Sequence, residues 1–263
     1  MNKTMKLINN RKSLRQYAED GVSREQKDSI IQAAMRAPTA GNMMLYTMIE
    51  VEDQSLKDRL VVTCDQQPFI AKSPFVLLFL ADYQRSFDYF LASDVEGFCQ
   101  EQGRTLRHPE EGDFLLACCD ALIAAQNAVV AAESLGLGSC YIGDIMENYE
   151  EHRRMFNLPD YVFPITMLCF GTPPGMYKDQ KPQIRFEQEF VHFKDSYRRL
   201  DSDDYGRMYA PMIKALTQGI QYKNGARNLG QHTYTRKFDS DFSREMSRSV
   251  REALKVWQKG GPP

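Results

Sequence analysis

The sequence predicts an α+β chain, in which helices and strands surround a core that contains a long helix. Two stretches carry this prediction. PFVLLFLAD, at residues 74–82, is apolar on both faces, which is typical of a central strand. Residues 113–138 have apolar side chains all round and are interrupted only by Asp120, Gln126, Asn127 and Glu133. These polar groups argue against a membrane span, so we expect a buried core helix with Gly136 at its C-terminal cap.

The other elements follow from local patterns. Ser23 and Gln26 have the spacing of a capping box, and apolar residues then recur at helical spacing up to Pro38. LYTMIEV, at 45–51, alternates like a half-buried strand, and a short helix follows over 56–62. Further strands are predicted at 138–143 and 164–171, with a helix around 147–156 between them. The last helix has one apolar face, formed by Phe242, Met246, Val250, Leu254 and Trp257.

Two regions depart from this regular pattern. Residues 83–112 are polar and aromatic by turns, and we interpret them as an insertion or lid of partly helical character within a domain that spans 1–200. Residues 201–263 are more polar and basic, with a basic loop before the final helix. We expect this C-terminal extension to belong to the same folding unit.

Composition excludes several classes of protein. Among 263 residues, 33 Lys and Arg nearly balance 35 Asp and Glu, so nothing points to nucleic acid or to a membrane surface. The N-terminal residues lack the apolar core of a signal peptide, and we expect a cytoplasmic protein. The six cysteines lack the paired spacing of a zinc site, so no metal is expected. None of His108, His152, His192 and His232 has a partner at suggestive spacing, and we expect no catalytic side chain.

The segment RKSLR, at residues 11–15, is the first candidate binding motif. Arg11, Lys12 and Arg15 place three cations around Ser13. Guanidinium groups donate in a planar fork that fits phosphate oxygens, and a hydroxyl adds a short donor. Alone, such a run is more often a solvated surface, so its meaning depends on what accompanies it.

Three further segments accompany it in order: AAMRAPTAGN (33–42), AAESLGLGSCYIG (131–143) and LCFGTPP followed by KPQIR (168–174 and 181–185). With RKSLRQY, this set closely resembles the nitroreductase family of FMN-dependent oxidoreductases, in particular its larger NADPH-dependent, oxygen-insensitive nitroreductase and flavin reductase branch. The resemblance covers residues 6–200 well. It implies the nitroreductase fold, a mixed central sheet flanked by helices in an intertwined homodimer, with two FMN sites built from both chains.

The resemblance also implies roles for individual residues. The phosphate, ribityl chain and pyrimidine side of FMN fall to Arg11, Lys12, Ser13 and Arg15, with Lys181 and Arg185 closing on the phosphate. The partner subunit's loop approaches the flavin with the residues that correspond to Pro38, Thr39, Ala40, Asn42 and Met44 of this chain. Tyr141, Ile142, Gly143 and Asp144 lie along the ring, and Gln67 reaches it.

The sequence departs from the family pattern in three places. Met44, Leu45 and Tyr46 stand where Gln-Pro-Trp is common, so one polar flavin contact is expected to be missing. Asp144 replaces the second of two glycines and adds a carboxylate, which would repel an anionic reduced ring unless it turns away or is paired. Gln183 reshapes the late basic pair, which moves the expected cation to Arg185.

These observations predict an enzyme that uses FMN and NAD(P)H, with NADPH favoured, to reduce nitroaromatics, quinones or flavins by ping-pong hydride transfer. Lys223, Arg227 and Arg236 are candidates for the extra phosphate of NADPH, although a solvated linker explains that loop equally well. One alternative keeps FMN but changes the reaction to reductive dehalogenation or flavin breakdown. Another is a flavin-free protein whose cations bind an acidic partner.

Overall fold

The computed structural model describes residues 1–177, 180–216, 222 and 225–258. Within it the chain divides into two compact units, one of Met1–Gln180 with Arg244–Pro263 and the other of Lys181–Ser243. The predicted division into a domain of 1–200 and an extension of 201–263 stays a prediction.

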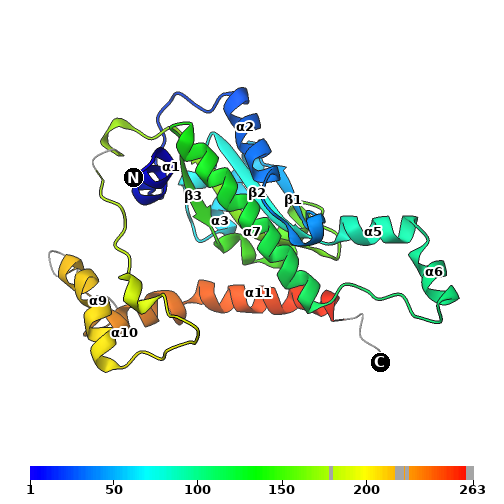
Figure 1. Cartoon of the computed structure of the whole chain (residues 1–263). Helices are drawn as coiled ribbons and strands as arrows, with labels where there is room; N and C mark the ends of the chain where they lie inside the picture. Colours follow the sequence, from blue (N-terminus) through cyan, green and yellow to red (C-terminus); the bar gives the residue numbers. More distant parts are fainter. Residues whose placement is uncertain (178–179, 217–221, 223–224, 259–263) are drawn as a thin grey trace. The chain divides into compact units, whose positions relative to one another are not determined.

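A four-stranded sheet forms the centre of the first unit (Figure 1). Its order is β1 (Tyr46–Glu50), β2 (Phe75–Asp82), β4 (Val162–Gly171) and β3 (Gly138–Ile142), and each neighbouring pair is antiparallel. The one parallel element among the described strands is a bridge between Ser13 and Ser139. Helices and antiparallel strands in one unit confirm the α+β class, and the mixed character of this sheet is limited to that bridge.

Helices α7 (Glu111–Ser134) and α2 (Arg24–Met35) cover one face of the sheet. Alanines at 121, 124, 125, 128 and 132 of α7 are fully buried against sheet residues such as Phe79 and Leu168. Short side chains let the helix lie close to the strands. Helix α7 is thus the buried core helix that the sequence predicted. The capping box of Ser23 and Gln26 at the start of α2 is confirmed on both of its hydrogen bonds.

Helix α7 is also long and apolar enough, by length and composition alone, to cross a membrane. In the first unit, however, its alanine face is part of the main apolar cluster of the sheet. The helix is therefore used as a core helix of the fold.

The opposite face of the sheet packs against α3 (Gln54–Thr63), α4 (Phe69–Lys72) and the short helix η2 (Asp144–Met146). Helix α8 (Tyr149–Met155) follows η2 directly. Because η2 joins β3 to α8, the residues after Ile142 are fixed between the sheet and α3. This position is important for the site described below.

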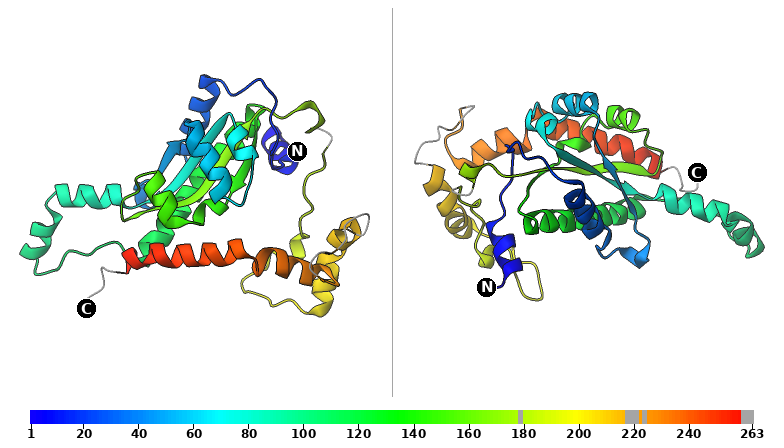
Figure 2. Two further views of the ribbon diagram at one scale, coloured as in Figure 1. Left: turned by 180° about the vertical axis from the view of Figure 1, so that it is seen from behind. Right: turned by 90° about the horizontal axis from the view of Figure 1, so that it is seen from above.

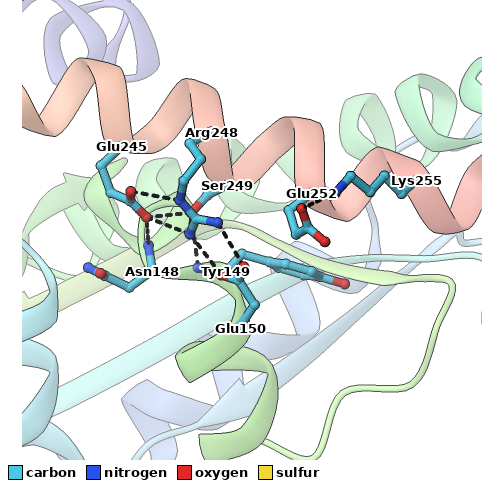
Figure 3. A network of polar contacts seen from close by, with 8 residues as sticks. All are labelled: Asn148, Tyr149, Glu150, Glu245, Arg248, Ser249, Glu252 and Lys255. Carbon is cyan, nitrogen blue, oxygen red and sulfur yellow. Dashed lines mark hydrogen bonds and ion pairs between the residues drawn. The ribbon is translucent and has the colours of Figure 1, made fainter.

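The last helix, α11 (Asp241–Trp257), returns to the first unit through its residues after 243. Trp257 is fully buried and makes edge contacts with Phe114 and Tyr161 at 5.2 Å between ring centroids. Figure 3 shows its polar contacts with the start of α8. Arg248 forms an ion pair with Glu150 at 2.7 Å, and Glu245 accepts from the backbone N–H of Asn148 at 3.1 Å. The predicted apolar face of the final helix is thus confirmed at Val250, Leu254 and Trp257.

Residues 83–112 contain α5 (Gln84–Ala92) and α6 (Val95–Glu101), which extend away from the sheet (Figure 2). Phe87 anchors this segment against His108 and Tyr161. The partly helical character is confirmed, whereas a role as a lid stays a prediction. At the N-terminus, α1 (Lys3–Asn10) precedes the RKSLR segment.

The second unit contains η4 (Gln188–Phe190), α9 (Ser202–Leu216), α10 (Leu229–Thr233) and the short helix η5 (Tyr234–Phe238). Arg207 joins two parts of this unit by ion pairs with Glu189 and Asp204.

Candidate functional site

The segment of residues 11–17 lies directly on the sheet because two glycines leave room for it. Gly138 and Gly171 are opposite each other in the register of β3 and β4. A Cβ at Gly138 would lie 2.8 Å from the side chain of Leu14, and one at Gly171 would lie 2.4 Å from that of Tyr17. The backbone N–H of Leu14 also donates to Ser139 O at 2.9 Å. Backbone pairing and the two glycines therefore fix where the cations of this segment emerge.

Lys12 is anchored by backbone groups of the loop that follows β4. Its Nζ donates to the carbonyl oxygens of Tyr177 and Gln180, each at 2.7 Å, and lies 4.5 Å from the centroid of the Tyr177 ring. The Tyr177 hydroxyl in turn donates to Lys12 O at 2.6 Å. An ammonium group has three donors, so one remains for a ligand.

Arg11 and Ser139 leave polar atoms without a partner at the same place. Arg11 Nε and Ser139 Oγ are buried and have no hydrogen-bond partner among the described residues. Glu133 lies nearby on α7, and burial raises the pKa of its carboxyl to about 7, against the lowering effect of Arg11 and Lys12. Buried donors without partners are costly in a folded protein and often mark a ligand site.

Two cavities adjoin this segment and share several lining residues. One, of about 240 Å³, is bordered by Ser13, Arg15 and Tyr177, together with Gln16, Pro174 and Gln180. The other, of about 630 Å³, adds Phe69 and Lys72 to Arg15, Gln16, Tyr17, Ala18, Pro68 and Pro174. Both cavities are bordered by Arg15, Gln16 and Pro174, so they lie next to each other beside this segment.

The opposite end of β3 carries the second group of candidates. Tyr141 faces α7, where its hydroxyl donates to Gln126 Oε1 at 3.2 Å, whereas Ile142 is buried on the α3 side. Gly143 and Asp144 then begin η2 and are half-buried. Four residues along a strand span about 13 Å, which is the backbone distance from Ser139 to Gly143. The Arg11 side chain reaches part of this way, with its guanidinium carbon 5.9 Å from the centroid of the Tyr141 ring.

Asp144 is paired. Gln67 Nε2 donates to Asp144 Oδ2 and also to Cys64 O, both at 2.9 Å. The Gln67 amide hydrogens therefore face inward, and its carbonyl oxygen is the group left to accept. The sequence predicted either a turned or a paired carboxylate at 144, and the structure shows the paired arrangement.

The loop between α2 and β1 contains Pro38, Thr39, Ala40, Asn42 and Met44, with η1 at Ala40–Asn42. Gly41, Asn42 and Met44 all have positive φ, at 54°, 58° and 51°. Left-handed backbone is strained for methionine, so the surrounding contacts have to hold it.

Asp120, a buried residue of α7, holds this loop at both ends. Its two carboxylate oxygens accept from Ala40 N at 3.0 Å and from Leu45 N at 3.1 Å. Arg85 of α5 adds a bond to Tyr46 O at 3.1 Å. The sequence pattern treated Asp120 only as an interruption of an apolar helix, because its partners lie about 80 residues earlier in the chain.

Asn42 and Met44 line a separate cavity of about 500 Å³ with three further methionines, Met35, Met43 and Met48. The two cavities beside segment 11–17 contain no residue of this loop, and this cavity contains neither Ser13 nor Arg15. A single chain thus keeps the two groups of candidate residues apart.

The remaining candidates lie in the second unit. Lys181, Arg185, Arg227 and Arg236 are exposed there, and Lys223 falls outside the described residues. Arg227 donates its backbone N–H to Gln231 Oε1 at 2.8 Å, and Arg236 Nη1 contacts His232 Nε2 at 3.4 Å.

The comparison with protein families decides where this arrangement belongs. The model of the nitroreductase family matches residues 8–172, which include the segment 11–17, both glycines and the loop at 38–44. The chain belongs to the nitroreductase family. Members of known sequence agree: "FMN reductase [NAD(P)H]" of Bacillus subtilis (strain 168) is 31% identical over 88% of this chain and 91% of its own length.

Two further similarities extend this finding. "Oxygen-insensitive NADPH nitroreductase" of Salmonella typhimurium (strain LT2) is 31% identical over 76% of this chain and 77% of its own length. The solved structure of NfrA2 from B. megaterium superposes with a TM-score of 0.82 at 30% identity and covers 98% of both chains. The nitroreductase fold expected from the sequence is therefore confirmed over nearly all of this chain, including the region beyond residue 172.

Sequence patterns missed several residues at the site. Tyr177 and Gln180 present carbonyl oxygens to Lys12, and Phe69 lies 5.9 Å from the Arg15 guanidinium carbon. Backbone carbonyls carry no side-chain signal, so Tyr177 and Gln180 could not have been found from residue types. The GTPPG turn before them was the one available hint.

Proposed function

We propose that this nitroreductase is an FMN-dependent oxidoreductase that takes electrons from NAD(P)H, with NADPH preferred, and reduces nitroaromatics, quinones or flavins. The observation that carries the proposal is the cationic segment 11–15, held on paired glycines beside a cavity. Relatives that are named FMN reductase and NADPH nitroreductase support the same cofactor and reductant.

The residues present fit the phosphate and ribityl chain of FMN. Lys12 keeps one free ammonium donor, and Arg11 Nε is buried without a partner. Ser13 and Arg15 border the adjoining cavity. Such charge-assisted donors are each worth about 1.5–3 kcal/mol. This donor set matches a phosphate better than a protein surface, because Arg11, Lys12 and Ser13 are only partly exposed.

FMN, when bound, supplies the two-electron redox chemistry. The chain's own part is to position the ring and set its surroundings. Backbone N–H groups of Gly143 and Asp144 lie at the end of β3, and the Gln67 carbonyl oxygen remains available as an acceptor. NAD(P)H and the acceptor would use the same open face in turn, and no side-chain nucleophile would be needed because FMN would itself carry the electrons.

The proposed active form is a homodimer, and α7 gives physical support. Its second face is apolar and exposed: Leu115 is 64% exposed and Leu122 is 42% exposed, with Leu116, Cys119 and Ile123 beside them. These positions recur at helical spacing, so the helix has two apolar faces and the sheet covers only one. A second copy that covers this face would also bring its 38–44 loop to a site that a single chain leaves without one.

Sedimentation tests the dimer. Leu122→Glu is expected to yield monomers that bind FMN at least tenfold more weakly, because it places a charge in the covered face. Val62→Glu, an equally drastic change at an exposed residue of α3, serves as the matched control and is expected to stay dimeric. A monomeric wild type that binds FMN stoichiometrically would contradict the shared site.

The NADPH preference is the finer part of the proposal. Arg227 and Arg236 are exposed cations of the second unit that suit a 2′-phosphate, and Lys223 completes the set expected from the sequence. The ratio of kcat/KM for NADPH over NADH is expected to fall in Arg227→Gln and Arg236→Gln. An unchanged ratio in both variants removes these residues from the proposal.

We also place the enzyme in the cytoplasm, where NADPH is available.

The overall function is tested with purified protein. We expect it to take up FMN with one flavin per chain and to oxidise NADPH in the presence of menadione or nitrofurazone. Protein that binds no FMN would favour an anion-binding protein instead. Flavin-loaded protein that turns over neither acceptor would favour one of the other FMN reactions.

A further inference from the structure

The carboxyl groups of Asp144 and Glu147 lie close together after β3, at the end of the strand where we propose that the flavin ring binds. The proposed function gives no role to Glu147. Glu147 follows η2 and is 5% exposed, and its Oε1 is buried without a hydrogen-bond partner among the described residues. Asp144 lies three residues earlier, and its backbone O accepts from Glu147 N at 3.0 Å. A buried, unpartnered carboxylate is unstable, so Glu147 needs either a cation or a proton.

The charged groups that the structure describes around Glu147 come from three parts of the chain and include no cation that could neutralise it, so a proton is the remaining choice. Asp144 of η2, Asp65 after α3 and Glu245 of α11 are the charged groups that act on it most strongly, and all are acidic. Glu245 is itself bound to Arg248, Ser249 and the N–H of Asn148.

The two other titratable neighbours on this side are neutral. His152 contacts Ile145 O and Thr63 Oγ1, each at 2.8 Å, and burial lowers its pKa. Burial also raises the pKa of the Cys64 thiol well above its usual value. Neither of these side chains therefore supplies a positive charge to Glu147 at neutral pH.

We propose that Glu147 holds a proton that it shares with Asp144, and that this carboxyl pair, with the Gln67 amide on the other Asp144 oxygen, is a redox-linked proton site beside the flavin ring. The inference rests on the proposed FMN function. Burial, with the charges of Asp144 and Asp65, raises the pKa of Glu147 to about 8, and a hydrogen bond with Asp144 contributes to the rise. The pair thus carries one net negative charge at neutral pH, not two.

The linkage to flavin reduction follows from electrostatics. When the ring gains electrons, added negative charge nearby makes a proton on the pair more favourable, so the pair binds its proton more tightly. The proton comes from solvent, and NAD(P)H supplies the electrons. Near and above the pKa of Glu147, reduction of the ring is then accompanied by uptake of an additional proton at Glu147. In this account, both residues act on the ring through charge and position and form no bond with the substrate.

The pair also orients Gln67. Because Asp144 and Cys64 O accept both of its amide hydrogens, the carbonyl oxygen is the group left to accept from a bound ligand. Replacing Asp144 by glycine would free the amide to rotate. Asp144, which departs from the family pattern, therefore determines that Gln67 offers its carbonyl oxygen, and not its amide N–H groups, to the flavin in our proposal.

The first test is independent of FMN. Infrared difference spectra between pH 6 and pH 10 of the protein without and with FMN should contain the C=O stretch of a protonated carboxylic acid that disappears as the pH rises. Glu133, whose pKa burial raises to about 7, contributes a second band of this kind. Glu147→Gln is therefore expected to lose the component that disappears near pH 8 and to keep that of Glu133, whereas Glu151→Gln, which changes a neighbouring carboxylate bound to Arg59, should keep both. If the wild type and Glu147→Gln give the same spectra, the shared proton is overturned, even if the enzyme binds FMN and is active.

The second test measures the midpoint potential of bound FMN against pH. The wild type is expected to show a steeper decrease with pH near and above pH 8 than Glu147→Gln or Asp144→Asn, whereas Glu151→Gln overlays the wild type. Should Glu147→Gln fail to fold, Asp144→Asn alone provides the comparison. Identical pH dependence in the wild type and in the pair variants would overturn the redox linkage. Failure to bind FMN would instead refute the proposed function.

Discussion

The two ends of strand β3 differ in charge and in how they are held. At one end, segment 11–17 places Arg11, Lys12 and Arg15 on the paired glycines Gly138 and Gly171. At the other end, Asp144 of η2 accepts from Gln67, and the buried Glu147 follows η2 directly. The cationic end suits a phosphate, which every FMN enzyme has to hold. In our proposal the acidic end acts on the flavin ring and tunes its reactivity.

The largest expected effect is at the cationic end. Gly171→Ala would place a Cβ 2.4 Å from Tyr17 Cδ1, so segment 11–17 has to move off the sheet. We expect a loss of about 3 kcal/mol in the free energy of unfolding, as for overpacked cores, measured by urea denaturation. Gly112→Ala has open space around its Cβ and is the control, with unchanged or slightly higher stability. Equal stability of the two variants would refute the close contact.

The loop at 38–44 belongs to neither end of β3. A substitution of Asp120, which holds this loop, tests whether the loop is a third, independent part of the site. In Asp120→Asn, one of the two backbone donors would face an amide NH₂, so we expect a loss of about 2 kcal/mol, measured as a lower Tm. Asp58→Asn changes an exposed residue of α3 and should leave the Tm unchanged. A loop that withstands Asp120→Asn without loss would show that Asp120 does not hold Met44 in its strained conformation.

Lys12→Gln sharpens the comparison by removing one phosphate donor without touching the ring end. The loss of about 1.5 kcal/mol for one charge-assisted hydrogen bond corresponds to FMN affinity about tenfold weaker, measured by fluorescence titration. Lys57 also donates to a backbone carbonyl, Ser73 O at 3.4 Å, and lies outside both cavities. Affinity in Lys57→Gln should equal that of the wild type, and an equal loss in both variants would argue against a phosphate at segment 11–17.

The smallest expected effect concerns pH and stability at the acidic end. The folded pKa of Glu147, about 8, lies above its unfolded value, so the folded chain holds a proton that the unfolded chain has lost. Its contribution to stability therefore falls as the pH rises from 5 to 8. Relative to the wild type, Glu147→Gln should gain about 1 kcal/mol across this window, with the shift discounted for solvent screening. Urea denaturation at pH 5 and pH 8 measures this difference in the free energy of unfolding. A difference that is the same at both pH values would show that Glu147 does not titrate in this range.

Much of the fold could be predicted from local patterns, because they reflect local physics. The capping box at Ser23, the doubly buried strand β2 and the long helix α7 each have their signal within a few consecutive residues. The two faces of α7 could not be separated in this way. A helix that is apolar all round looks the same whether one face or both are covered, and only the packing against the sheet distinguishes them.

The candidate site was predictable in its residue types and less so in its contacts. The cations at 11–15 and the unusual Asp144 are visible in the sequence. Gly138 and Gly171 become a pair only through strand register, and Gln67 reaches Asp144 across 77 positions. Glu147 gave no signal at all, because its importance depends on burial and on acidic neighbours from three separate elements.

The central claim is that binding and redox tuning of FMN are separated between the two ends of β3. The most direct test measures both the FMN affinity and the pH dependence of its midpoint potential in Lys12→Gln and in Glu147→Gln. We predict a crossed result: Lys12→Gln binds oxidised FMN about tenfold more weakly with the pH dependence of the wild type, and Glu147→Gln binds it normally with a flatter pH dependence. Variants that change both quantities together, or neither, would contradict the separation.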